Sequence, residues 1–295
     1  MKQNIISITG IVFAILIAAL VSIAGGQGGQ GGLQLMDIPL LVLFGLFAFS
    51  VQWVAFIPAF IFQTENYFDL IGSLTYIGLA VAAFLFSDRE PGAILITLMV
   101  MIWAIRLGSF LFSRVRKAGH DSRFKNIKPD FLQFLMTWTL QGLWVFLTFA
   151  AGLTAVTSGA QHSIDGFVIL GAGLWLCGFL IEVVADAQKS TFRRDPGNLD
   201  KFIQHGLWAW SRHPNYFGEI LLWTGVAVVA IPALEGWQFL TLISPVFVYI
   251  LLTQISGVRM LEHSARRKWG NDPEYQAYCE RTPTLWLNPI SPGNR

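Results

Sequence analysis

Charged residues are scarce in this chain of 295 amino acids. Asp, Glu, Lys and Arg together make up 13% of it, whereas hydrophobic residues make up 54%. Ordinary soluble domains carry about 25% charged residues, so the composition argues against that class. The net charge of +2 says little by itself. A chain this poor in charge is an integral membrane protein by composition.

Cysteine is also scarce. Cys177 lies within an apolar run, and Cys279 lies close to the C-terminal end. Two thiols so far apart suit neither a disulfide framework nor a zinc site, so we expect no metal ion. The glycine-rich stretch GGQGGQGG at 25–32 has no flanking strand. We therefore expect a flexible loop there and not a dinucleotide cradle.

Apolar runs long enough to cross a bilayer, or nearly so, recur along the chain. A membrane-spanning helix needs about 20 such residues. The runs occupy 5–24, 39–62, 70–86, 92–112, 133–156, 165–185, 218–233 and 238–257. They predict an all-α, polytopic membrane helix bundle with about eight transmembrane helices. Merging or re-entry of either short run, 70–86 or 218–233, would leave seven.

Basic residues collect in three segments between the apolar runs. Of the twenty Lys and Arg residues, six lie in 113–130, five in 186–217 and six in 258–295. If every run crosses once, these segments share one side, whereas loops 25–37 and 157–164 opposite have none. Because positive loops stay in the cytoplasm, eight crossings place both termini there.

A charged stripe follows the apolar run 165–185, in IEVVADAQKSTFRRDP (181–196). Glu182, Asp186, Lys189 and Arg193 recur at spacings of four, three and four, so they share one helical face. A face that becomes more basic outward would suit an extended anionic ligand with its phosphates toward water. The alternative is a self-paired stripe ending in interfacial anchors, which is the better explanation for Arg194.

A second polar cluster is SRHPNYFGEILLWTG (211–225). Pro214 suits the first turn of a helix, where Asn215 and Glu219 would point the same way. Arg212 and His213 come just before that helix. The alternative, an interfacial anchor made of Arg, His and Tyr, leaves Glu219 in the apolar run unexplained.

The third cluster is VRMLEHSARRKWG (258–270). Arg259, His263 and Arg267 share one helical face at spacings of four, and Glu262 lies beside them. The alternative is the basic tail that usually follows a last transmembrane helix. Since all three clusters lie on one membrane side, we expect them to share a pocket.

Three segments, ADAQKSTFRRDP, GLWAWSRHPNYFGE and RRKWGNDPEYQAYCERTP, together resemble the C-terminal signature of the membrane steroid 5α-reductases and sterol reductases and their bacterial relatives. The resemblance covers about residues 170–290. It implies an oxidoreductase that uses NADPH to reduce a carbon–carbon double bond in a steroid-like lipid. It implies that the cofactor is bound by Asp186, Lys189, Arg193, Arg212, His213, Asn215, Tyr216, Glu219, Arg259, His263 and Arg267, although position 267 is aromatic in some relatives.

The N-terminal half carries a further likeness, in FQTENYFD (62–69). Steroid 5α-reductases have an adjacent Gln–Glu pair here, whereas Gln63 and Glu65 of this chain are separated by one residue. The resemblance implies that Glu65 polarises the substrate carbonyl; burial would keep it protonated, as a donor to the developing enolate. The alternative is a solvated loop containing Glu65 and Asp69.

The tyrosine partner of that carboxyl group has no match in MIWAIRLGSF (101–110), which offers Trp103 and Arg106. Tyr76 or Tyr67 is left to supply the hydroxyl. We assign catalysis to Glu65 and Tyr76, and substrate binding to Gln63, Glu65, Trp53 and Trp103. A steroid or similar lipid entering from the bilayer would need an apolar cavity. We therefore expect one membrane domain over 1–295, in which 1–156 forms mainly the lipid cavity and 165–295 binds the cofactor and ends in a cytoplasmic segment.

A second enzyme class remains open, because RHPNYFGE also resembles the isoprenylcysteine carboxyl and phospholipid methyltransferases, which bind S-adenosylmethionine. That cofactor has no phosphate to attract Lys189, Arg193 and Arg212, so the basic stripe favours NADPH. A transporter or sterol-sensing module would also bury charges but would not require the three-part signature. We expect membrane lipids, but no nucleic acid or protein, as partners. The bacterial likeness and the ending SPGNR favour a bacterial inner membrane; a eukaryotic chain would lie in the endoplasmic reticulum.

Overall fold

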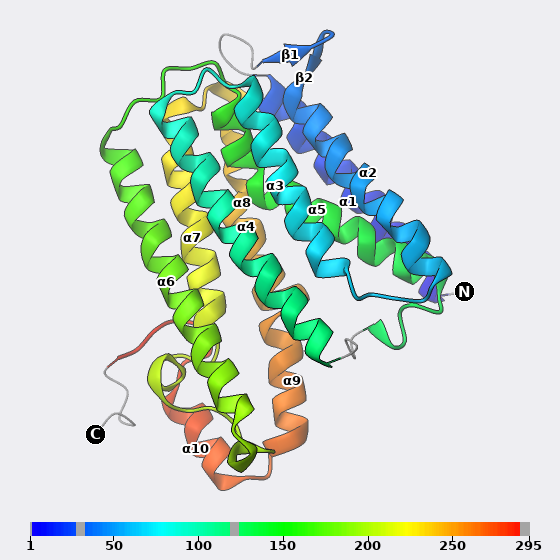
Figure 1. Cartoon of the computed structure of the whole chain (residues 1–295), viewed down its shortest axis with the longest axis vertical. Coiled ribbons are helices and arrows are strands. Elements are labelled where there is room, and N and C mark those ends of the chain that lie inside the picture. Colours follow the sequence, from blue (N-terminus) through cyan, green and yellow to red (C-terminus); the bar gives the residue numbers. More distant parts are fainter. Residues whose placement is uncertain (1, 28–32, 119–123, 290–295) are drawn as a thin grey trace. The chain divides into compact units, whose positions relative to one another are not determined.

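The computed structural model describes residues 2–27, 33–118 and 124–289 and is almost wholly helical (Figure 1). The glycine-rich stretch predicted as a loop lies largely outside these ranges, as does the ending SPGNR. The α-helices are α1 (Lys2–Gly26), α2 (Leu40–Ile61), α3 (Phe68–Phe86), α4 (Pro91–Ala118), α5 (Phe131–Val156), α6 (Gly166–Arg194), α7 (Pro214–Ala230), α8 (Ile243–Ile250), α9 (Val258–Trp269) and α10 (Pro273–Arg281). Strands β1 (Gln34–Leu35) and β2 (Ile38–Pro39) form a short antiparallel pair.

Eight helical segments within the described ranges are long and apolar enough to cross a membrane. Helices α1 to α7 supply one each. The eighth, Gly236–Trp269, combines a 3-10 helix (Gly236–Leu242), α8, a π-helical turn (Leu251–Ile255) and α9. The prediction of an all-α, polytopic membrane helix bundle is confirmed, with eight candidate membrane-spanning helices in the described ranges, and both short apolar runs are separate helices.

The chain forms two compact units, of which the first comprises Met1–Ile169 and Val226–Ser244. Helix α5 is its core: 89% of its apolar window is buried, against 28% for α1. Helices α1, α2, α3 and α4 all contact α5. The outer helices therefore keep apolar surface for lipid, and the first unit is a bundle built around one buried helix.

The second unit comprises Leu170–Gly225 and Pro245–Arg295. In it, glycines bring α6 and α7 into backbone contact. A Cβ atom at Gly178 would lie 2.5 Å from the carbonyl oxygen of Gly218, and one at Gly225 would lie 2.5 Å from the backbone nitrogen of Trp175. Small residues permit this approach between membrane helices. Helix α7 begins at Pro214, as the sequence predicted, and Asn215 in its first turn contacts Asp186 of α6.

The last membrane segment is interrupted between α8 and α9. The π-helical turn is followed by Gly257, where a Cβ atom would lie 2.4 Å from the carbonyl oxygen of Leu252 and 2.8 Å from the ring of Tyr216. A side chain at this position would clash with both. The apolar run predicted at 238–257 therefore ends at this break, and α9 starts a new helix beyond it.

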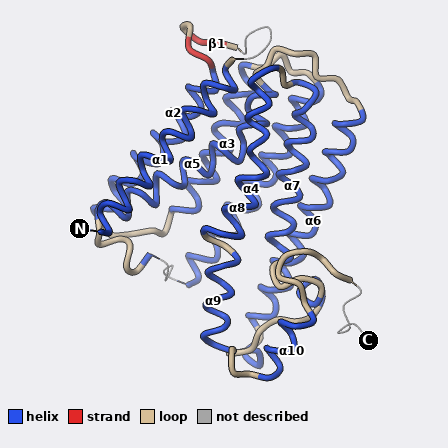
Figure 2. The backbone as a smooth tube through the Cα atoms, turned by 180° about the vertical axis from the view of Figure 1, so that it is seen from behind, coloured by secondary structure: helices blue, strands red, loops and turns tan. Residues whose placement is uncertain are grey.

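Loop segments gather near α10 in the same unit (Figure 2).

Replacing Gly178 with alanine should destabilise the protein, because the added methyl group would overlap the backbone of α7. Overpacking of this kind costs about 1–3 kcal/mol. Gly173, in the same helix, has open space where a methyl group would be added, with no atom within 4 Å. Thermal unfolding in detergent should show a clear loss for Gly178→Ala and none for Gly173→Ala. Equal stabilities of the two variants would contradict the close approach of α6 and α7 at Gly178.

Candidate functional site

A cavity of about 270 Å³ in the second unit is lined by residues from separate stretches of the sequence. Its basic side chains are Lys189, Arg193, Lys201, Arg212 and Lys268, and its aromatic ones are Phe192, Phe202, Trp208, Trp269, Tyr275 and Tyr278. Glu262 contributes a carboxylate. Guanidinium and ammonium groups beside flat aromatic walls suit an anionic ligand that carries a planar ring.

Trp208 forms a fixed wall of this cavity. Its indole nitrogen donates to the carbonyl oxygen of Ala185 at 3.0 Å, and the Tyr278 hydroxyl donates to the Trp208 carbonyl at 2.7 Å. The Lys189 ammonium lies 4.4 Å from the centre of the indole ring. This cation–π contact holds the last basic turns of α6 against the wall.

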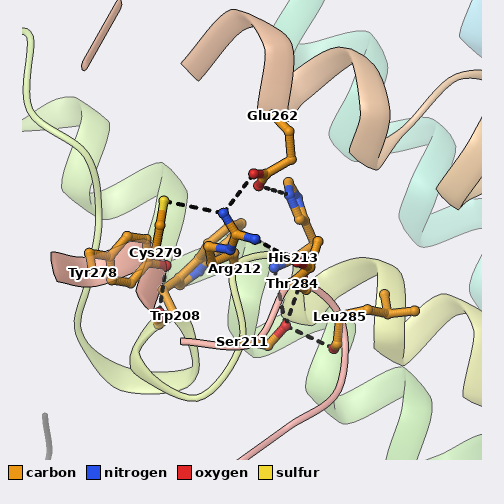
Figure 3. Close-up of polar contacts among 9 residues, drawn as sticks. All are labelled: Trp208, Ser211, Arg212, His213, Glu262, Tyr278, Cys279, Thr284 and Leu285. Atoms are coloured by element: carbon orange, nitrogen blue, oxygen red, sulfur yellow. Dashed lines mark hydrogen bonds and ion pairs between the residues drawn. The ribbon is translucent and has the colours of Figure 1, made fainter. Parts of the chain in front are cut away.

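Glu262 joins α9 to the loop before α7 (Figure 3). One carboxylate oxygen accepts a hydrogen bond from Arg212 Nη1 at 2.6 Å, and the other lies 2.8 Å from His213 Nε2. Arg212 also donates to Thr284 Oγ1 and lies 3.2 Å from the Cys279 sulfur. Sequence spacing could not identify Glu262 as this partner, because the groups that it binds belong to a different element.

His213 is buried and neutral at pH 7. Burial lowers its pKa from the ordinary value of 6.5, and this effect outweighs the hydrogen bond to Glu262, which raises the pKa. The charges of Lys189 and Arg212 lower the pKa further. Because a carboxylate only accepts hydrogen bonds, Nε2 carries the hydrogen and donates it to Glu262.

Two tyrosines from α10 close the cavity, and their roles were missed in the sequence. Burial raises the pKa of both Tyr275 and Tyr278 well above the usual value of 10.0. Their hydroxyl groups therefore stay protonated. Lys201 and Lys268 were missed as well, and Lys268 forms an ion pair of 2.7 Å with Asp200. The sequence did contain a signal for the two tyrosines. They belong to the segment RRKWGNDPEYQAYCERTP, which carries part of the resemblance, but they were given no role from the sequence.

Other predicted cofactor residues lie next to this cavity, between α6 and α7, without lining it. Asn215 Nδ2 donates to Asp186 Oδ1 at 3.3 Å. Glu219 is buried on the same turns of α7. The Tyr216 ring stacks on His213, with 5.7 Å between ring centres. The predicted clusters on α6 and α7 therefore form one continuous polar region.

The basic face predicted on α9 lies elsewhere. Arg259, His263 and Arg267 are exposed and do not line the cavity. The lining residues of α9 are instead Leu261, Glu262, Ser264, Ala265, Lys268 and Trp269. The cavity thus gives no support to a cofactor role for the three basic residues, although they belong to the right helix.

Glu65, in the first unit, is buried but not isolated. It is 4% exposed, and its carboxylate forms an ion pair with Lys128. The carboxyl group of Glu65 therefore has a cationic partner in the ligand-free protein. Its role as a hydrogen-bond donor to the substrate carbonyl stays a prediction. Lys128 was missed, because nothing in its sequence surroundings pointed to a partner in another loop.

The remaining predicted substrate residues have separate surroundings. Tyr76 and Trp103 are fully buried and pack edge to face, with 5.1 Å between ring centres. Trp53 donates to Thr139 Oγ1 at 3.0 Å, and Gln63 donates to the Phe60 carbonyl at 2.7 Å. Tyr76 is eight residues into α3, about 12 Å along its axis from the end near Glu65. Tyr76 and the helix end near Glu65 therefore lie at different levels along α3.

The folded protein should lose stability as the pH falls from about 7 to 5, partly through His213. Unfolded histidine takes up a proton below about pH 6.5, whereas buried His213 resists protonation, so the unfolded state binds more protons. Chemical denaturation in detergent should show a shallower pH dependence for His213→Gln. The exposed His205 provides the control: His205→Gln should keep the wild-type slope. An unchanged slope in His213→Gln would refute the assignment.

Comparison with known proteins gives partial matches. Bovine 3-oxo-5-alpha-steroid 4-dehydrogenase 1 is 32% identical over 75 residues, which is 25% of this chain and 29% of the bovine protein. The human protein of the same name is 36% identical over 66 residues, covering 22% of this chain and 26% of its own length. An uncharacterised Schizosaccharomyces pombe protein is 22% identical over 213 residues, covering 61% and 59% of the two chains.

The matches thus cover less than a third of these two steroid dehydrogenases and less than two thirds of the yeast protein. No solved structure matches the chain. The model of the DUF1295 family, described as proteins of unknown function, matches residues 55–282 and so includes every residue of the cavity. The chain belongs to the DUF1295 family and has a limited likeness to 3-oxo-5-alpha-steroid 4-dehydrogenases.

Proposed function

We propose that the protein is an NADPH-dependent membrane reductase that saturates the carbon–carbon double bond of a lipid enone, such as a 3-oxo-Δ4 steroid. The observation that carries the proposal is the basic, aromatic cavity at the end of α6, in a chain with partial likeness to 3-oxo-5-alpha-steroid 4-dehydrogenase 1. The bacterial inner membrane, as its location, is part of the same proposal.

The residues of the cavity fit one end of a phosphorylated dinucleotide. Its volume of about 270 Å³ lies just below the range of about 300–1,000 Å³ for pockets that hold a whole ligand. The aromatic walls suit an adenine ring, and Lys189 and Arg193 suit phosphate. Two buried nitrogens, Arg212 Nε and His213 Nδ1, have no hydrogen-bond partner among the described residues. The hydrogen-bonding capacity of these two side chains is therefore not used up by protein contacts, as expected at a site for a polar ligand.

The other end of the dinucleotide would lie along α6 and α7, toward Asp186, Asn215 and Glu219. Carboxylate and amide oxygens accept hydrogen bonds from ribose hydroxyls and from a carboxamide. Asp186, Asn215 and Glu219 would orient the nicotinamide ring, while Arg212 and Lys189 would bind the phosphates. NADPH, when bound, supplies the hydride for the reduction.

The chemistry at the enone requires a hydrogen-bond donor at the carbonyl. As hydride adds to the β-carbon, an electron pair moves onto the carbonyl oxygen; the pair then returns to the α-carbon, which takes a proton from water. Donors aimed at the developing enolate lower the barrier. In the Glu65–Lys128 pair, the ammonium group of Lys128 would add donor hydrogens beside the carboxyl group of Glu65. The pair would thus act as a unit.

NADPH should bind more tightly than NADH, and Arg193→Ala should remove much of this preference. A lost charge-assisted hydrogen bond typically costs about 1.5–3 kcal/mol, or roughly one to two decades in affinity. Quenching of tryptophan fluorescence measures both affinities. Arg194 is the matched control: it is the next residue but does not line the cavity, so Arg194→Ala should bind NADPH as the wild type does.

Two results would contradict the cofactor assignment. Equal affinities for NADPH and NADH would show that no side chain binds the additional phosphate group of NADPH. Binding of S-adenosylmethionine alone would favour the methyltransferase alternative, which the basic lining makes the weaker candidate.

If the carboxyl group of Glu65 takes part in polarising the carbonyl, Glu65→Gln should retain more steroid turnover than Glu65→Ala. The amide keeps a donor and a contact for Lys128, whereas alanine loses both. The expected loss for alanine is on the order of a hundredfold or more, by analogy with removal of one oxyanion donor. Conversion of progesterone with deuterium-labelled NADPH measures it and locates the transferred atom.

NADPH binding should survive in both Glu65 variants, because the cavity belongs to the second unit. Full turnover in Glu65→Ala would exclude the assigned role. Deuterium absent from the β-carbon of the product would exclude the proposed reduction.

A further inference from the structure

The C-terminal strap, residues 282–289, is bound along the loop that precedes α7. The backbone nitrogen of Arg212 donates to the Pro283 carbonyl at 2.9 Å, and that of Asn288 donates to the Trp210 carbonyl at 2.9 Å. The Ser211 hydroxyl donates to the Leu285 carbonyl at 2.8 Å. The strap is therefore fixed at both ends to the loop that supplies Arg212 and His213 to the cavity.

Trp286 is an exposed residue of the strap. Its side chain is 65% exposed, whereas its neighbour Leu285 is 7% exposed. The indole lies edge-on to the ring of Phe217, with 5.8 Å between ring centres. Phe217 is the fourth residue of α7 and part of a candidate membrane span. The exposed indole therefore lies beside the first turn of a membrane helix.

An indole at this level is suited to the lipid headgroup region. Tryptophan concentrates at membrane–water interfaces, because its ring is apolar and its N–H group can remain hydrated. In water, a large exposed aromatic ring would lose the free energy of burial. The location beside the start of α7 thus explains why an exposed tryptophan occurs in an otherwise well-bound strap.

We infer that the bilayer holds the strap in place through Trp286 and that the strap in turn positions Arg212 in the cavity. Thr284 Oγ1, two residues before Trp286, accepts a hydrogen bond from Arg212 Nη2. This contact, with the backbone bond from Arg212 to Pro283, transmits the position of the strap to the guanidinium group. The partner of the surface is a lipid bilayer. Only the effect on NADPH rests on the proposed function.

The first experiment measures the contact with lipid. In nanodiscs whose phospholipids carry bromine near the headgroup end of the acyl chains, Trp286→Phe should lower the quenched fraction of tryptophan fluorescence. Hydrogen exchange of residues 283–289 should become faster in Trp286→Ala, on the order of tenfold. Trp237 is also 65% exposed but lies in the first unit, so Trp237→Ala should leave exchange in the strap unchanged.

The second experiment measures the effect on the cavity. Wild-type protein should bind NADPH about two- to tenfold more tightly in nanodiscs than in a short-chain detergent, which corresponds to the ordering of one long side chain. Trp286→Ala should remove this difference, and Trp237→Ala should keep it.

The outcomes separate this inference from the proposed function. An unchanged quenched fraction in Trp286→Phe, or wild-type exchange of the strap in Trp286→Ala, would overturn the inference whether or not NADPH binds. Absence of NADPH binding to the wild type, with faster exchange in Trp286→Ala, would overturn the proposed cofactor and leave the membrane contact established. Equal NADPH affinities of the wild type in nanodiscs and detergent would overturn the coupling to Arg212.

Discussion

The carboxylate of Glu262 is the constraint on which the candidate site depends. It lies at the junction of two elements and accepts from both Arg212 and His213. The side chains of all three residues are at most 15% exposed. Removing one partner of a buried ion pair typically costs about 3–5 kcal/mol, because the other charge is left uncompensated. Glu262 thereby fixes the distance between α9 and the loop before α7, and with it the width of the cavity.

The positions of the membrane helices were predictable because each depends on local composition. A run of apolar residues predicts a membrane helix wherever it occurs, and Pro214 indicates the start of α7 without reference to the rest of the chain. The polar face of α6 was predictable for the same reason, since Lys189 and Arg193 are separated by one helical turn. Both residues line the cavity.

Contacts between distant segments could not be derived in this way. Glu65 and Lys128 are 63 residues apart, and no periodicity relates them. A single sequence indicates that Glu65 follows an apolar helix, but the protonation state of a carboxyl group depends on what lies against it. The tyrosines of α10 present the same difficulty: their spacing gives a short helix, but only the fold shows that this helix closes the cavity.

The π-helical turn before α9 has a consequence for the phase of that helix. Each residue advances an α-helix by about 100°, and a π turn accommodates one extra residue without an added turn. A helical wheel continued from α8 through Leu251–Ile255 is therefore out of register with α9. The backbone of Ser256 and Gly257 leaves the helical conformation after this turn, so the rotation of α9 does not continue that of α8. On α9, Glu262 and Lys268 line the cavity whereas Arg259 and His263 do not, and it is the break before α9 that sets which of its charges belong to the site.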